Sequence, residues 1–156
     1  MKRQGLKFAL VSVIVISTII IGSISLTIQS KKLIGPVIIL LGFLPWIPLR
    51  FSGRTIKSAG ADIIFGAIDT GMLGITALIG AGFAGILGAI VGGAVGDSIT
   101  DAFAGLFEGQ VAEKLRKRGI EESRTPLSSS MGKMSGCLLG VGIVLSIAWS
   151  IIGINI

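Results

Sequence analysis

The sequence predicts an all-α, polytopic integral membrane protein with about five transmembrane helices and a glycine-rich helical hairpin at its centre. First, 51% of the 156 residues are hydrophobic and the mean hydropathy is +0.91. Second, only 14% of the residues are charged, whereas soluble domains average about 25%. Third, the apolar runs are long enough to cross a hydrocarbon core about 30 Å thick. No polar stretch is long enough to fold alone, so residues 1–156 are expected to form one transmembrane domain.

The first two spans are predicted at residues 8–28 and 33–49. The basic N-terminus followed by an apolar run resembles a signal peptide. However, the run is longer than a usual h-region and lacks a small-x-small cleavage site, so we expect a retained helix. The second span is short, and Pro45, Trp46 and Pro48 are expected to end it because proline lacks the amide donor that a helix needs.

The central apolar stretch, residues 61–107, is too long for one span. As a single helix it would measure about 70 Å at 1.5 Å per residue. It is therefore expected to fold back, with a turn at Gly80-Ala81-Gly82, where glycine permits a positive φ. This gives spans at 61–80 and 83–107. A re-entrant hairpin, with four full spans in the whole protein, is the alternative that the sequence leaves open.

A polar loop is predicted at residues 108–130, followed by a last span at 134–154. Within the loop, Glu113 and Lys117 are spaced i,i+4 and could pair on a short helix. Gly119 is placed to end that helix. The serines at 128–130 could cap the start of the last span.

The basic residues predict the orientation. With the N-terminus in the cytoplasm, all but two of the 14 Lys and Arg residues fall on the cytoplasmic side, the exceptions being Lys31 and Lys32. This satisfies the positive-inside rule, with the loop 108–130 cytoplasmic and the C-terminus external, in the cell membrane. The net charge of +6 thus reflects topology rather than nucleic-acid binding. The expected partners are membrane lipids and either further copies of the chain or a larger membrane complex.

Asp69, Asp97 and Asp101 lie inside the apolar central stretch. A carboxylate at membrane depth costs about 2.5–3.5 kcal/mol on insertion scales, so three of them indicate a function. If residues 61 and 107 lie at one level, the residue opposite Asp69 is near Ile99. Asp97 and Asp101 share one helix face at i,i+4, so the three carboxylates could meet. Hydroxyls at the same depth come from Thr70, Ser98 and Thr100.

Oxygen ligands of this kind suit a hard cation such as Mg²⁺, Ca²⁺, Mn²⁺ or Na⁺, or a proton. The sequence contains no histidine, so the usual imidazole ligand and near-neutral acid–base group are missing. The structural alternative is that the aspartates pair with Lys133, Arg54 or Lys57 at the cytoplasmic boundary, or that they cap helix kinks through backbone amides. Asp62 and Glu108, at the predicted ends of the hairpin, are expected to be interfacial.

Glycines recur every four residues in two rows. One row is Gly88, Gly92 and Gly96, and the other is Gly132, Gly136 and Gly140. Small residues at this spacing let helix backbones approach closely in lipid. The rows predict either tight packing within the chain or contact between copies.

A short segment of the second predicted hairpin helix resembles two enzyme families. Gly93-x-x-x-Asp97-x-x-x-Asp101 looks like the second half of the CDP-alcohol phosphotransferase signature, but the first half, Asp-x-x-Asp-Gly-x-x-Ala-Arg, is absent. Gly96-Asp97 with Gly105 and Gly109 resembles the Gly-Asp segment of membrane cytidylyltransferases and polyprenol kinases. These resemblances cover about fifteen residues, and no family is assigned on them.

Three functions are compatible with the sequence. The first is a small cation- or proton-coupled transporter in which Asp69, Asp97 and Asp101 are the ligands, working as an oligomer because five helices enclose little pathway alone. The second is a Mg²⁺-dependent lipid-headgroup transferase at the cytoplasmic leaflet. The third is a non-catalytic subunit of a larger membrane complex. In the second function, phosphates would be held by Arg116, Lys117, Arg118 and Arg124.

Overall fold

The computed structural model describes residues 2–117 and 125–154. Within them the chain is helical and contains no strand. Four stretches are long and apolar enough to cross a membrane: Gly5–Thr27, Lys31–Phe51, Ile56–Phe107 and Pro126–Ile152. The predicted all-helical class is confirmed among the described residues, and four of their helical stretches have the length and composition of membrane spans.

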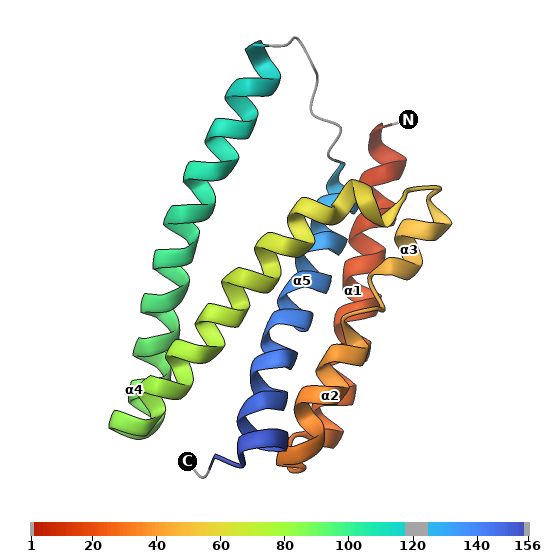
Figure 1. Cartoon of the computed structure of the whole chain (residues 1–156). Coiled ribbons are helices and arrows are strands. Elements are labelled where there is room, and N and C mark those ends of the chain that lie inside the picture. The colour runs from red at the N-terminus through yellow and green to blue at the C-terminus, as the bar shows by residue number, and fades with distance from the viewer. Residues whose placement is uncertain (1, 118–124, 155–156) are drawn as a thin grey trace.

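Seven helical segments make up the fold, and helix α5 lies at its centre. Helix α5 packs against α1, α2, α3 and α4, and Figure 1 shows the two chain termini at opposite ends of the bundle. The segments are α1 (Lys2–Thr27), α2 (Lys31–Leu41), α3 (Trp46–Phe51), the 3₁₀ turn η1 (Ile56–Ala59), α4 (Gly60–Lys117), α5 (Pro126–Leu145) and the π-helical end η2 (Ser146–Ile152).

The predicted second span is interrupted earlier than expected. Helix α2 ends at Leu41, and the six-residue helix α3 begins after Pro45. The turn between them is tied to α5, because the indole Nε1 of Trp46 donates to Ser135 Oγ at 2.9 Å and that hydroxyl donates to the carbonyl of Gly42 at 2.7 Å. The prolines remove helical amide donors here, and Ser135 supplies replacement hydrogen bonds.

Helix α4 reverses its direction at Ala84 and Gly85, whose φ and ψ are not helical. Gly85 has φ +56° and ψ −134°, a conformation open to glycine and strained for residues with a Cβ. The turn predicted at Gly80-Ala81-Gly82 is therefore wrong in position, since those residues are helical. We call residues 60–83 the first arm and residues 86–117 the second arm of α4; Figure 1 shows the second arm, in teal, standing apart from α1, α2 and α5.

Glycines bring the two arms into backbone contact near the turn. A Cβ on Gly88 would clash with the carbonyl of Gly80, and a Cβ on Gly92 would clash with that of Thr76. Farther from the turn the arms separate, as Figure 1 shows, and a Cβ on Gly105 would meet nothing within 4 Å. The first predicted glycine row thus packs within the chain.

The second glycine row joins α5 to the first arm. A Cβ on Gly136 would clash with the carbonyl of Ile63, and one on Gly140 with that of Ala67. A Cβ on Gly132 would lie 2.7 Å from the Cβ of Asp62. Such approaches leave no room for any side chain, so this row fixes the distance between the two helix axes.

The predicted polar loop is largely helical where the structure describes it. Helix α4 continues to Lys117, and α5 begins at Pro126, eight residues before the predicted start at 134. The N-cap of α5 is Thr125, not one of the serines, although Ser128 returns a reciprocal bond to it in a capping box. The predicted Glu113–Lys117 pair is confirmed at 2.9 Å. Gly119 lies outside the described residues.

Candidate functional site

Asp69 on the first arm is joined to Thr100 on the second arm by a hydrogen bond. The Thr100 hydroxyl donates to Asp69 Oδ1, and it also lies within reach of its own helix at the carbonyls of Gly96 (3.1 Å) and Asp97 (3.0 Å). A hydroxyl has one proton to donate, and the carboxylate is the nearest of these acceptors. The register predicted from the sequence placed Asp69 opposite Ile99, which is one residue from its observed partner, Thr100.

Asp97 and Asp101 both lie on the second arm, three residues before and one residue after Thr100. Their spacing of four residues places them on neighbouring turns of one helix face. Asp69 and Asp97 are partly buried, whereas Asp101 is exposed on the surface of the second arm. The three acidic residues therefore face environments that differ in exposure.

The remaining predicted hydroxyls do not join this group. Ser98 is exposed and donates to the carbonyl of Ala94 in its own helix at 2.8 Å. Thr70 is half-buried, and none of the hydrogen bonds found among the described residues links it to a carboxylate. Thr100 is thus the one predicted hydroxyl for which a bond to an acidic side chain is observed.

A hollow of about 210 Å³ opens between the arms beside the Asp69–Thr100 bond. Its walls are apolar apart from these two residues and are formed by Phe65, Ile68, Phe103, Ala104 and Phe107. The hollow lies on the side away from the turn, where the arms separate (Figure 1). A polar pair at the base of an apolar wedge is where water or an ion could reach the carboxylate.

A three-carboxylate metal site is not preformed. Within residues 2–117 and 125–154, no three acidic or cysteine side chains are grouped so that they could hold a metal ion. Mg²⁺ and Ca²⁺ need six or more oxygen ligands close to the ion. Metal binding by Asp69, Asp97 and Asp101 therefore stays a prediction from the sequence.

Asp62 is a buried carboxylate that the sequence reasoning placed at the interface. It is only 1% exposed, and Ser129 Oγ of α5 donates to its Oδ1 at 3.2 Å. Asp62 makes a further interaction besides this bond. Arg54 also has an interaction partner. The sequence signal that could have found it is Gly132 in the second glycine row, because that glycine lets α5 approach the first turn of α4.

Of the four basic residues of the transferase hypothesis, Lys117 is the one whose side chain the structure describes. Lys117 pairs with Glu113, and it is about 24 Å along the second arm from Asp101 at 1.5 Å per residue. None of the residues that line the hollow beside Asp69 is basic. Arg116 belongs to α4 but its side chain is not described, and Arg118 and Arg124 lie outside the described residues.

Comparison of the chain with protein-family models, with curated proteins and with solved structures finds no match. The functional argument therefore rests on the chemistry of α4 alone.

Proposed function

We propose that this protein couples proton movement to transport through Asp69 and Asp97, with Asp101 as a third exchange group. The observation that carries the proposal is the Asp69–Thr100 hydrogen bond, which joins two apolar arms beside an open hollow. Asp97 lies three residues before Thr100 on the second arm. Ionisable residues within membrane segments are costly, and in transporters they form proton relays or ion sites. Two carboxylates that share a site lower that cost when one of them keeps its proton.

A proton fits this geometry better than a metal ion does. One carboxylate with a hydroxyl neighbour is sufficient to accept and release a proton, whereas a hard metal ion needs several oxygens at once. The hollow on one side of Asp69 gives a proton access from the end where the arms separate. Toward the turn, the glycine contacts of Gly80, Gly88 and Gly92 leave no space between the arms.

Near the turn, the contact between the two arms closes the direct route for a proton. A proton released toward the turn must pass outside the contact between the arms or wait for the arms to part. Thr76 is the one polar side chain in this part of the hairpin, and its hydroxyl donates to the carbonyl of Met72 at 2.9 Å in its own helix. We therefore propose an oligomer, in which the exposed face of the second arm, with Asp101, lies against another copy.

We further propose that each arm crosses the bilayer, giving five spans. The first arm is about 36 Å long and the apolar part of the second, residues 86–107, is about 33 Å at 1.5 Å per residue. Both lengths exceed the thickness of a hydrocarbon core, about 30 Å. A re-entrant hairpin would not need arms of this length. The basic residues place the N-terminus and residues 118–124 in the cytoplasm and the C-terminus outside. A reporter at Ile156 should therefore read as external and one near Glu121 as cytoplasmic.

Proton flux in proteoliposomes tests the proposal. Vesicles with a trapped pH indicator would receive a pH gradient and a potassium–valinomycin potential. D69N and D97N keep the size of the side chain and remove its charge, so each should slow proton flux at least tenfold, and D101N should slow it less. E113Q, which neutralises an exposed carboxylate outside the apolar segment, is the matched control and should behave as wild type.

The same variants decide between the proposal and its rivals. If D69N, D97N and E113Q all carry wild-type flux, the aspartates are structural and the subunit hypothesis takes first place. A thermal-shift titration with Mg²⁺, Ca²⁺, Mn²⁺ and Na⁺ tests the cation prediction, since a bound ion stabilises by about 2.7 kcal/mol at a hundred times its dissociation constant. If one ion stabilises the wild-type protein and D97N abolishes this stabilisation, then that ion, and not a proton, is the ligand of the site.

A further inference from the structure

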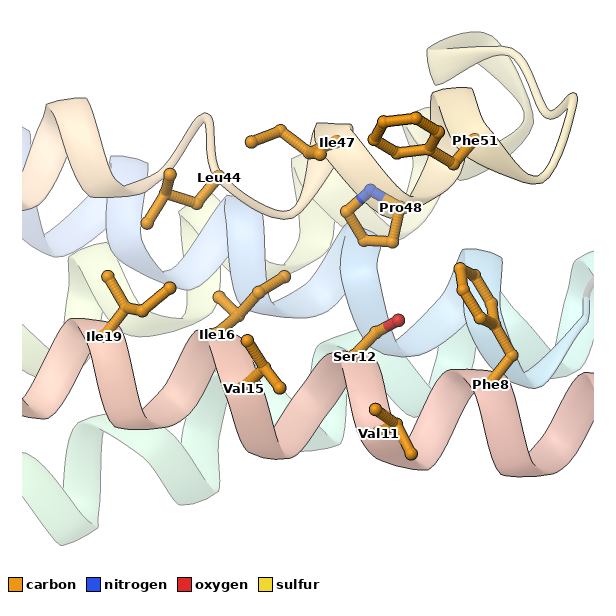
Figure 2. Close-up of a pocket in the computed structure, with 10 residues that line it drawn as sticks. All are labelled: Phe8, Val11, Ser12, Val15, Ile16, Ile19, Leu44, Ile47, Pro48 and Phe51. Atoms are coloured by element: carbon orange, nitrogen blue, oxygen red, sulfur yellow. The ribbon is translucent and has the colours of Figure 1, made fainter.

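A long apolar groove runs between α1 and the α2–α3 segment, far from the acidic group. Figure 2 shows residues 8–19 of α1 along one wall and residues 44–51 along the other. The groove has a volume of about 440 Å³, and Ser12 is the one polar side chain among the residues that line it. Its rim is exposed, with Val15 at 51%, Ile47 at 51% and Phe51 at 83%. The groove is therefore open on the outer surface of the bundle.

The length of the groove matches one leaflet. From Phe8 to Ile19 the α1 wall measures about 16 Å at 1.5 Å per residue. That is about half of a 30 Å hydrocarbon core. A partner transmembrane helix would contact the bundle over the full thickness of the core. An acyl chain, in contrast, occupies one leaflet.

Positive charge gathers at one end of the groove. A second hollow, of about 490 Å³, shares Ile47 and Phe51 with the groove and is lined in addition by Trp46, Arg50 and Ile56. Arg50 is exposed, and no carboxylate among the described residues pairs with it. Lys7, which is also exposed, directly precedes Phe8 at the same end. Lys7 lies near the start of the α1 span at Gly5, and Arg50 lies near the end of the α2–α3 span at Phe51. Basic residues near the ends of spans attract anionic lipid headgroups.

We propose that this groove is a binding site for an anionic phospholipid of the N-terminal-side leaflet. One acyl chain lies between α1 and the α2–α3 segment, and the phosphate group contacts Arg50, with Lys7 nearby. The apolar length of one leaflet selects a lipid chain over a helix. The guanidinium of Arg50, which pairs with no carboxylate of the described residues, selects an anionic headgroup over a zwitterionic one. Arginine suits this role because its planar fork can bind two phosphate oxygens at once.

Fluorescence quenching of Trp46 by brominated lipids tests the site. The W149F background leaves Trp46 as the only tryptophan, and Trp46 lines the hollow next to Arg50. Protein in phosphatidylcholine vesicles would be titrated with phosphatidylglycerol or phosphatidylcholine carrying dibrominated chains. Phosphatidylglycerol should bind about fivefold more tightly for each basic residue engaged. R50Q should remove most of this preference, and K133Q, which neutralises an exposed lysine of α5, should retain it.

A pair of neighbouring substitutions on α1 separates the groove from the general lipid surface. Val15 lines the groove and Ile14 does not, and both are exposed. V15F should fill the groove and weaken phosphatidylglycerol binding at least fivefold, whereas I14F should not. Equal quenching by the two lipids, or equal effects of V15F and I14F, would overturn the proposal. The proposal would also be overturned if both lipids quenched weakly and the quenching grew as the protein was diluted into lipid. In that case a second copy of the chain would cover the groove.

Discussion

Helix α4 makes two glycine-lined interfaces, one with α5 and one between its own arms. The two interfaces differ in what surrounds them. At the α4–α5 interface the glycines are buried, and the buried carboxylate, Asp62, is hydrogen-bonded by Ser129. Between the arms the glycines are equally close, but the outer face of the second arm is exposed and carries Asp101. The first interface holds the bundle together, and the second brings ionisable groups together while leaving one side uncovered.

The difference lies in what surrounds each row of glycines. Around Gly136, α4 and α5 belong to a bundle that α1 and α2 complete on the other side. Around Gly92, the second arm has the first arm beside it and stands away from the rest of the bundle (Figure 1). The same small-residue spacing thus gives an interface enclosed by the bundle in one place and an interface with one uncovered side in the other.

The largest expected effect comes from G136A at the α4–α5 interface. The added Cβ would clash with the carbonyl of Ile63, and backbone cannot move aside as a flexible side chain can. We expect the free energy of unfolding to fall by about 3 kcal/mol, at the upper end for overpacking, in a detergent-denaturation titration. G22A on α1, where a Cβ meets nothing within 4 Å, should be neutral or stabilising. Equal stability of the two variants would contradict the packing described here.

G92A between the arms should have a smaller effect on stability and a larger one on geometry. Its Cβ would clash with the carbonyl of Thr76, but the second arm stands apart from α1, α2 and α5, so fewer contacts oppose its displacement (Figure 1). We expect a loss of about 1–2 kcal/mol and a longer distance between spin labels at positions 68 and 103, measured in a C137S background. G105A, in open space on the same arm, should keep the wild-type distance; if it lengthens the distance equally, the clash is not the cause.

T100V should cost about 1 kcal/mol by removing the hydrogen bond to Asp69. A double-mutant cycle with D69A isolates the coupling between the two residues, because each single variant removes the same bond. T18V is the matched control, since the Thr18 hydroxyl donates to Ile14 of its own helix at 2.9 Å. A coupling energy near zero would mean that the bond does not hold the arms together.

E113Q should have the smallest effect. The Glu113–Lys117 pair measures 2.9 Å, but its side chains are 60% and 74% exposed. Exposed i,i+4 pairs contribute less than about 0.5 kcal/mol and are screened by salt. Denaturation titrations at low and high salt should therefore show a small difference that salt removes. A loss comparable with that of T100V would place this end of the second arm in a contact not seen here.

The position of the α4 turn shows how two lines of sequence reasoning can disagree. Glycine content favoured residues 80–82, whereas aligning the ends of the stretch 61–107 places its midpoint at residue 84. The structure follows the alignment, with the turn at Ala84 and Gly85. The reason is that the apolar parts of the two arms, residues 60–83 and 86–107, must match in length and in small-residue contacts, such as that of Gly80 with Gly88. Glycine permits a turn at many positions in this segment, so its presence alone does not select one.

The sequence by itself determined the helical membrane class, the fold-back of the central stretch, the glycine rows and the Glu113–Lys117 pair, because these follow from chain length, hydropathy and helical spacing. Only the tertiary structure decided which neighbour each polar group meets. It joined Thr100 to Asp69, left Ser98 bonded to its own helix, and buried Asp62 against α5. The physical reason is that helix spacing fixes the face on which a side chain lies, whereas burial depends on which helix covers that face.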